Sequence, residues 1–346
     1  MSLQKPTATI VIPHFNGEAI LRRCLVSLQA SRYPSFRVLV VDNASTDGSM
    51  PMLRSEFPEA EIVHSRRNLG YAGGCNLGIR SSKGEYVALL NNDTVVDPDW
   101  LGPLVERMES DDSVAAVQPK LLSIRDPHRF DYCGAAGGEL DIFGYPFARG
   151  RLFQTIEKDE GQYDDPRTVF WASGAAALIR RSALNRIGLL DEAFFAHMEE
   201  IDLNWRMQKA GYRIAFEPRS VVYHQTGATL SQESARKILL NQRNNLIMVF
   251  KNYQCRSLVR ILPVRMVLDL ITVLAFPVLG LKRSAAVVAG WAAALFSLPV
   301  ILRGRARNKA CARIPDSEIM RRMYRGSVAL AYYLRGIRKA SQLHIG

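Results

Sequence analysis

Apolar runs alternate with amphipathic segments along the N-terminal part of the chain. The β-branched, apolar runs predict buried strands at 8–13, 36–42, 60–65 and 85–91. Helices are predicted between them, over 20–28, over 47–56 and from about 71. Ser45 or Thr46 is expected to cap the second of these helices. Strands that alternate with helices in this way predict an α/β fold with a mainly parallel sheet.

The pattern loosens after residue 119. Glycine, proline and aromatic residues mix over 120–150, which predicts loops and hairpins. A strand followed by a helix is expected over 169–184, and a helix over about 199–210 that Gly211 ends. The segments YRIAFEP and SVVYHQ are predicted to form two short strands. The α/β domain is therefore expected to occupy residues 1–230.

Residues 231–346 predict a second, helical region. A basic amphipathic helix is expected over 236–253, and two strongly apolar runs follow at 266–281 and 284–302. From residue 236 onward the chain holds 20 Lys and Arg but only 3 Asp and Glu, so the overall net charge of +12 arises in this region. Such asymmetry predicts an anionic partner, and the apolar runs favour a membrane surface over nucleic acid.

Three arrangements of this region are consistent with the sequence. Helices that lie in the membrane interface with basic faces toward anionic lipid are the preferred interpretation. A spanning hairpin and the interface of a soluble homodimer are the alternatives. Basic residues on both flanks of the uncharged run do not fit a single crossing of the membrane. The five cysteines are scattered and form no paired motif, and the N-terminus lacks the apolar core of a signal peptide. We therefore expect a reducing cytoplasm, with the protein on the inner face of the plasma membrane.

Polar segments follow each of the predicted N-terminal strands. They are HFNG, DNASTD, RRNLG and NND, in chain order. In a parallel sheet, ligands bind beyond the carboxyl ends of the strands, so these segments are expected to form one site. The sequence has neither a G-x-G-x-x-G motif after the first strand nor a P-loop, which disfavours dinucleotide-binding and P-loop enzymes.

Several acidic residues have both a chemical and a structural interpretation. Asp93, at the end of NND, is either a divalent-metal ligand or a turn cap. Asp42 either accepts a hydrogen bond from a nucleotide or caps the following helix. The acids Glu199, Glu200 and Asp202 suit a helix start, where they meet the dipole, but a crowded carboxylate can also be a general base. His224 is either structural or, if the fold brings it to Asp93, a ligand.

As a set, these elements resemble glycosyltransferase family 2, the inverting nucleotide-sugar transferases of GT-A fold. The resemblance rests on ATIVIPHFNG, VLVVDNASTDGS, NLGYAGGCNLGI, GEYVALLNND, ASGAAALIRRSAL, HMEEIDLNWRMQKAGYRI and VVYHQTGAT, in the family order over residues 8 to about 230. Each motif is weak alone, but the ordered set is specific. It is most similar to bacterial rhamnosyltransferase-like members that build surface polysaccharides.

The resemblance implies a role for each matching position. The nucleotide cradle comprises Pro13, Phe15, Asn16, Asp42, Asn43, Asn68, Gly70 and Asn92. Asp93 and His224 correspond to ligands of a divalent Mg or Mn ion, and Glu200 to the catalytic base, with Glu199 and Asp202 as alternatives. The donor or acceptor sugar is expected near Trp171, Ser173 and Gly174.

Two positions depart from the family pattern. Asn91 replaces the first acid of the D-x-D motif, which removes one negative charge from the metal site, and Glu200 replaces an aspartate. The resemblance implies transfer of a sugar, with dTDP-rhamnose preferred over a UDP-sugar as donor, to a lipid-linked or polysaccharide hydroxyl. The rival interpretations are a non-catalytic membrane-bound adaptor and a nucleotidyltransferase. The latter normally has a Gly-rich basic loop where this chain has HFNGEA.

Overall fold

The computed structural model describes residues 7–225, 235–275 and 280–344. The N-terminal elements alternate as predicted: β1 (Ala8–His14), α1 (Glu18–Gln29), β2 (Phe36–Asp42), α2 (Ser49–Glu56), β3 (Glu61–His64), α3 (Gly70–Ser81) and β4 (Tyr86–Leu90). Strands β1, β2 and β3 are parallel, and so are β1 and β4. The predicted α/β class and these four strands are therefore confirmed.

The helices cover both faces of this sheet because its strands are apolar on both sides. Ile10 and Ile12 of β1 belong to a core that α1, α2 and α4 (Leu101–Glu109) complete. Val11, between them, points to the opposite core with α3, α5 (Arg181–Ile187) and α6 (Glu199–Lys209). At Gly78 a side chain on α3 would collide with Val11, so the small residue lets this helix pack closely on the sheet.

The second half of the sheet is mixed. It adds β5 (Thr94–Val96), β6 (Val114–Ser123), β11 (Arg167–Val169), β12 (Ala176–Arg180) and β13 (Arg213–His224). The strand order within the described residues is β11-β13-β6-β12-β4-β1-β2-β3, with β5 beside β13. The two short strands predicted over YRIAFEP and SVVYHQ form the single strand β13, and the pairing register of β13 with β6 shifts between Glu217 and Val221. Such a bulge bends a strand without ending it.

The predicted hairpins form a second, antiparallel sheet. Its strands are β7 (Gly138–Leu140), β8 (Pro146–Ala148), β9 (Arg151–Leu152) and β10 (Thr155–Ile156). Phe147 and Leu152 of this sheet share a small core with Val328 of helix α13 (Val328–Tyr333).

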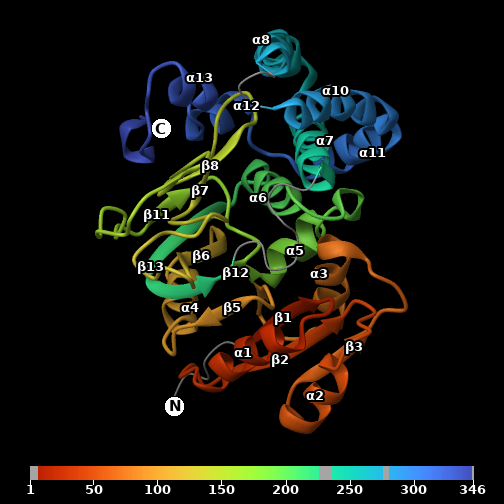
Figure 1. Cartoon of the computed structure of the whole chain (residues 1–346), viewed down its shortest axis with the longest axis vertical. Coiled ribbons are helices and arrows are strands. Elements are labelled where there is room, and N and C mark those ends of the chain that lie inside the picture. Colours follow the sequence, from red (N-terminus) through yellow and green to blue (C-terminus); the bar gives the residue numbers. More distant parts are fainter. Residues whose placement is uncertain (1–6, 226–234, 276–279, 345–346) are drawn as a thin grey trace.

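The C-terminal region is helical, as predicted. It comprises α7 (Ala235–Asn252), α8 (Cys255–Leu274), α10 (Leu281–Phe296), α11 (Leu298–Cys311), α12 (Asp316–Ile319) and α13, with short 3-10 turns at Met320–Arg322 and Ala340–Gln342. In Figure 1, α8, α10 and α11 lie at the opposite end of the molecule from β1, β2 and β3, with α6 and α7 between them.

The two regions share one core. Trp205 of α6 packs edge-on against Phe170 and against Tyr253, which follows α7, at ring distances of 5.6 and 4.8 Å. Buried Ile247 and Ile301 from the C-terminal helices belong to the same cluster. The boundary predicted at residue 230 lies outside the described residues, and the helices that follow it pack as part of the fold.

The apolar run over 284–302 is divided between two helices. Helix α10 ends at Phe296, and α11 begins at Leu298 with a proline, Pro299, in its first turn, where its missing N–H is tolerated. Within the described residues, no single helix is long and apolar enough to cross a bilayer. The segments Ser284–Phe296 and Leu298–Cys311 meet that requirement only as a pair bent by 67°.

The predicted cap of α2 was wrong. Gly48 is the N-cap residue of this helix and has no side chain to cap it, and Oδ1 of Asp47 accepts the amide of Ser49, the first helical residue, at 3.1 Å. The amides of Ser45 and Thr46 are instead bound by Asp42 and Asn16, which commits both residues to the loop after β2. The carboxylate of Asp47 accepts hydrogen bonds from the amides of Gly17 and Glu18 and so caps α1 from a neighbouring loop.

Candidate active site

Strand pairing brings Asp93 and His224 together from distant parts of the sequence. Asp93 lies between β4 and β5, and His224 is the last residue of β13, which pairs antiparallel with β5. The Oδ1 atom of Asp93 is 3.1 Å from Nε2 of His224, and both side chains are buried. The sequence prediction that these two residues could meet depended on the fold, and the structure places them in contact.

The other ring nitrogen of His224 faces Asp131. Its Nδ1 atom is 2.8 Å from Oδ1 of Asp131, which lies in the loop after β6. Burial alone would lower the pKa of His224, but Asp131 and Asp93 together raise it well above its usual value. Carboxylates that hold a histidine in this way fix the orientation of metal-binding imidazoles. Sequence reasoning missed Asp131, because nothing in its loop indicates which strand end it approaches.

These side chains fit a divalent cation. Neighbouring ligands of an octahedral Mg²⁺ lie about 3 Å apart, which matches the Asp93–His224 separation of 3.1 Å. Oδ1 of Asp93 is buried and faces Nε2 of His224, so the two atoms lie where a single cation could take both as ligands. Asn91 turns its amide nitrogen toward His224 Nε2 at 3.5 Å, and because an amide NH2 group does not bind a cation, Asn91 adds no ligand in this orientation. Asp131, Cys133 and His224 also place their ligand atoms within 4.8 Å of one another.

The loops after β1 and β2 are tied to each other. Asp42 accepts the amide of Ser45 at 2.8 Å and contacts His64 Nδ1 at 3.1 Å. Burial opposes ionisation of Asp42, but these contacts lower its pKa. Asn16, at φ 55°, accepts the amide of Thr46 at 2.8 Å. The cradle residues on these two loops therefore hold one another in place.

The third loop is joined to the same group. Asn43 donates to the carbonyl of Gly70 at 3.2 Å, and Asn68 accepts the amide of Gly70 at 2.8 Å. Gly70 has φ +72°, and a Cβ there would lie 2.5 Å from the carbonyl oxygen of Phe195. This glycine is needed both for the backbone conformation and for the close approach of the segment before α6.

Around Pro13, the cradle combines an exposed ring with a buried histidine. Pro13 is buried, whereas Phe15 is 40% exposed, which is unusual for a phenylalanine beside buried polar residues. Asn92 donates to Nδ1 of His14 at 2.8 Å, and His14 Nε2 lies 2.8 Å from Ser49 Oγ. Burial lowers the pKa of His14, which favours the neutral ring. His14 links two cradle loops, although its position in HFNG gave no sign of that role.

Glu199 and Glu200 begin α6 from a strained turn. Met198, which precedes them, has φ 74°. Burial, followed by the charge of Glu200, raises the pKa of Glu199 well above its usual value, and burial raises the pKa of Glu200 to about 7. Each has a buried Oε2 without a hydrogen-bond partner among the described residues. Glu200 is the more exposed of the two, so it is better placed to meet a substrate.

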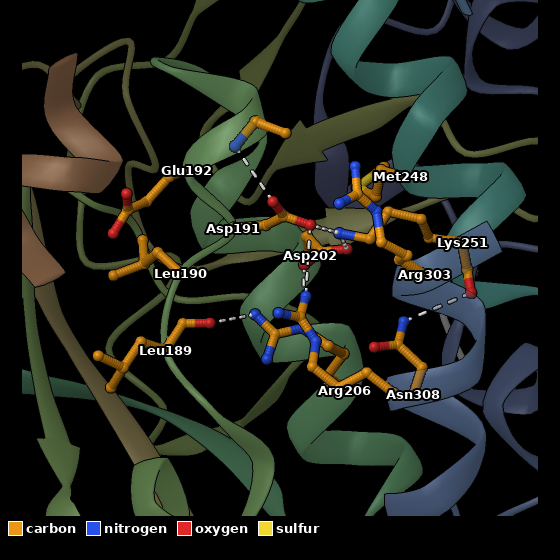
Figure 2. Close-up of polar contacts among 12 residues, drawn as sticks. Leu189, Leu190, Asp191, Glu192, Asp202, Arg206, Met248, Lys251, Arg303 and Asn308 are labelled. Carbon is orange, nitrogen blue, oxygen red and sulfur yellow. Dashed lines mark hydrogen bonds and ion pairs between the residues drawn. The ribbon is translucent and has the colours of Figure 1, made fainter. Parts of the chain in front are cut away.

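Asp202 has a different environment from the two glutamates. Its carboxylate contacts Lys251 at 3.0 Å and Arg206 at 2.9 Å and accepts a hydrogen bond from Asn252 (Figure 2). Burial opposes ionisation, but Lys251 and Arg206 lower the pKa of Asp202 to about 2. A carboxylate so occupied is a poor proton acceptor at neutral pH, so its geometry favours a structural role over the alternative of a base.

The predicted sugar-binding residues lie in a segment that is mostly buried. Trp171 is 4% exposed and donates from Nε1 to the carbonyl of Glu139, and the amide of Ser173 donates to Oε1 of Gln118. The carbonyl of Gly174 accepts the hydroxyl of Tyr71, and the next carbonyl, of Ala175, accepts the amide of Asn91. This segment thus joins α3 to the NND turn, and only Gly174 of the three residues is partly exposed.

These features define a nucleotide-sugar transferase site on an α/β sheet, and the comparisons agree. The model of the family described as "Glycosyl transferase family 2" matches residues 9–188, and the chain belongs to that family. The chain is therefore a nucleotide-sugar-dependent glycosyltransferase, as the motifs predicted.

Two relatives come from Mycobacterium tuberculosis. One is named N-acetylglucosaminyl-diphospho-decaprenol L-rhamnosyltransferase and is 28% identical over 245 residues, which cover 66% of this chain and 78% of the relative. The other is named pre-mycofactocin glycosyltransferase and is 30% identical over 237 residues, which cover 66% of this chain and 45% of the relative.

Solved structures confirm the GT-A fold. The mannosyltransferase PcManGT from Pyrobaculum calidifontis, in complex with GDP-Man and Mn²⁺, matches with a TM-score of 0.53 and 20% identity over 89% of this chain and 86% of its own. GalNAc-T7, with UDP, GalNAc and Mn²⁺, matches with a TM-score of 0.56 and 16% identity over 73% of this chain and 49% of its own. At these identities the likeness concerns the fold.

Proposed function

We propose that this enzyme transfers rhamnose from dTDP-rhamnose to a hydroxyl of a lipid-linked or polysaccharide acceptor, with inversion at the anomeric carbon. The observation that carries the proposal is the similarity to the mycobacterial rhamnosyltransferase, which spans 78% of that relative. UDP-sugars are the alternative donors.

Glu200 acts as the base in this proposal, with Glu199 next in order. Its pKa of about 7 leaves a substantial ionised fraction at neutral pH, together with useful proton affinity. Glu200 takes the proton of the acceptor hydroxyl while that oxygen bonds to the anomeric carbon. The bond from the anomeric carbon to the diphosphate breaks, and the nucleoside diphosphate leaves with the electron pair. Much of the rate enhancement comes from positioning and from stabilisation of the leaving group.

Asp93 and His224 are the proposed ligands of a divalent metal, Mg²⁺ or Mn²⁺, and Asp131 orients His224. When bound, the metal neutralises charge on the diphosphate leaving group. Phe15 offers its exposed ring to the base, and the loops that hold Asp42 and Asn43 form the walls around the nucleoside.

Binding of dTDP, UDP and GDP, each with and without Mn²⁺ or Mg²⁺, tests the nucleotide site first. We expect metal-dependent thermal stabilisation that is largest for dTDP. Release of dTDP from dTDP-rhamnose in the presence of a polyprenyl-diphosphate saccharide then tests the transfer. Selective stabilisation by UDP would transfer the proposal to a UDP-sugar donor, and stabilisation by none of the three would contradict it.

An anionic membrane surface is the proposed location of the acceptor. Exposed apolar side chains lie along the C-terminal helices, notably Met266, Val267, Leu274, Leu295 and Phe296, the last of which is 89% exposed. Exposed basic residues accompany them on the same helices: Arg256, Arg260, Lys282, Arg303, Arg307 and Lys309. Apolar and basic groups together suit helices that lie in the interface of an anionic bilayer, at the cytoplasmic face of the bacterial plasma membrane.

Flotation with liposomes tests this location. We expect the protein to float with anionic vesicles, less with neutral ones, and weakly after Leu295→Glu. The control is Val26→Glu, because Val26 is 54% exposed on α1 at the other end of the molecule (Figure 1). Equal flotation of the two variants, or no flotation of the wild type, would contradict the proposed membrane surface.

A further inference from the structure

The segment before α6 has an unusual backbone. Phe195, His197 and Met198 have φ values of 61°, 71° and 74°, in the left-handed region that residues other than glycine rarely adopt. Each such residue is strained and persists only where its surroundings hold it. The segment leads directly into Glu199 and Glu200, so its conformation determines where both carboxyl groups lie.

One buried side chain of α7 binds this strained segment at several points. Asn244 is fully buried, and its Nδ2 lies 2.9 Å from the carbonyl oxygens of Phe194, Ala196 and His197. Its Oδ1 accepts a hydrogen bond from Arg243 at 3.0 Å. The two amide hydrogens of Asn244 are therefore shared among three carbonyls of the turn, of which that of Phe194 also accepts the amide of Ala196 at 2.7 Å.

The same helix fixes both flanks of the segment. Lys251 contacts Asp191 at 2.5 Å on one side and Asp202 at 3.0 Å on the other, and Figure 2 shows its amine between the two carboxylates. With its ends held by ion pairs, the segment can change conformation mainly in the middle, where Asn244 binds.

We propose that Asn244 is a positioning residue for catalysis, which holds the segment 194–198 so that Glu200 reaches the acceptor hydroxyl. This inference rests on the role proposed above for Glu200. Asn244 acts through the backbone and does not touch the substrate. A residue of the C-terminal helices is thereby part of the apparatus that orients the base.

Asn244→Asp is the sharpest test, because it keeps the shape and the acceptor for Arg243 but removes the donor. We expect kcat to fall about 10- to 100-fold, as for a displaced catalytic group, with KM for the donor within about threefold. The ionisable groups coupled to Glu200 are Glu199 on its own helix and Tyr71 and Cys75 on α3. A loosened segment admits water to Glu200, so the acidic limb of the kcat profile should move to lower pH relative to Asn245→Asp, which introduces the same negative charge one residue further along α7.

The adjacent residue supplies a matched control. Asn245 is also buried on α7, but it donates to the carbonyl of Gly144 and accepts from Arg265, so it does not touch the segment. Asn245→Asp should leave the acidic limb where it is in the wild type. Asn244→Ser keeps one hydrogen-bond donor on a shorter side chain, so it should shift the acidic limb of the kcat profile by an intermediate amount. It replaces Asn244→Asp in the test if that variant does not fold.

Hydrogen exchange separates this inference from the proposed function. Amides 195–200 should exchange at least tenfold faster in Asn244→Asp than in Asn245→Asp, whether or not a donor is turned over. Equal exchange in the two variants, or an unchanged acidic limb in folded Asn244→Asp, would overturn the positioning role. Absence of turnover by the wild type with every donor would instead count against the proposed function.

Discussion

Replacing Lys251 by methionine removes a buried positive charge between two buried acids. Lys251 is completely buried, and so is Asp202, while Asp191 is 15% exposed at its side chain. Methionine fills a similar volume, so the change tests charge more than packing. Asp202 keeps Arg206 and Asn252 as partners, but Asp191 keeps only the partly exposed Arg307 among its cationic contacts in the described structure.

The expected loss follows from the pKa of Asp202. Its folded value of about 2 lies below an unfolded value of about 3.9, which corresponds to roughly 2–3 kcal/mol of stability at neutral pH. Because the folded pKa is the lower one, this stability is present above about pH 4 and is lost as the pH falls toward 2. Removing one partner of a buried pair typically costs about 3–5 kcal/mol, so we expect a loss in that range.

Urea unfolding, followed by tryptophan fluorescence at pH 7 and pH 5, measures the effect. The difference from the wild type should be smaller at pH 5, because the unpaired carboxylates of Asp191 and Asp202 can then bind protons. Arg307→Met is the control, since Arg307 also contacts Asp191 but is 43% exposed and should cost at most about 1 kcal/mol. A loss below 1 kcal/mol for Lys251→Met, or equal losses for both variants, would refute the reasoning.

The remaining predictions concern the site. Glu200→Gln should lower kcat about 10²- to 10⁴-fold with little change in donor binding. In the wild type, kcat should fall about tenfold per pH unit below 7, because the pKa of Glu200 is raised to about 7 and only the ionised carboxylate is active. A pH series of nucleotide release measures both effects. An unchanged kcat in Glu200→Gln would exclude Glu200 as the base. Asp93→Asn should abolish the Mn²⁺-dependent part of nucleotide stabilisation while sparing the metal-independent part, and an unchanged metal response in thermal shift would exclude Asp93 as a ligand. Phe15→Ala should weaken nucleotide binding about tenfold in calorimetry, in line with about 1–3 kcal/mol for base stacking; a change below twofold would contradict stacking.

The sheet could be predicted from the sequence because its strands are apolar on both faces. Runs such as ATIVIP and VALL are continuous, so no register had to be inferred to find them. The approach of Asp93 to His224 was predicted only conditionally, because it depends on the pairing of β13 with β5. Asp131 and Asn244 could not be found, since each acts through a contact between segments far apart in the chain.

One local prediction failed because of contacts outside its own segment. Ser45 and Thr46 do not cap the helix, because their amides donate hydrogen bonds to Asp42 and Asn16 in the loops after β2 and β1. The apolar run over 284–302 has the composition of one helix, yet it bends at Ser297, where Pro299 starts a new one. Composition predicts how apolar a segment is, whereas the place where a helix ends depends on its neighbours and on single prolines.

The core shared by α6 and the C-terminal helices limits how this protein can be divided or recombined. A fragment that stops near residue 230 would expose one face of Trp205 and leave the carboxylate of Asp202 without Lys251. Lys209 would likewise lose Asp316, which it contacts at 2.9 Å. Residues 1–230 therefore do not form an independent domain that can be transferred to another protein. A functional chimera with another acceptor-binding region needs its junction beyond α12, or must carry replacements for these C-terminal partners.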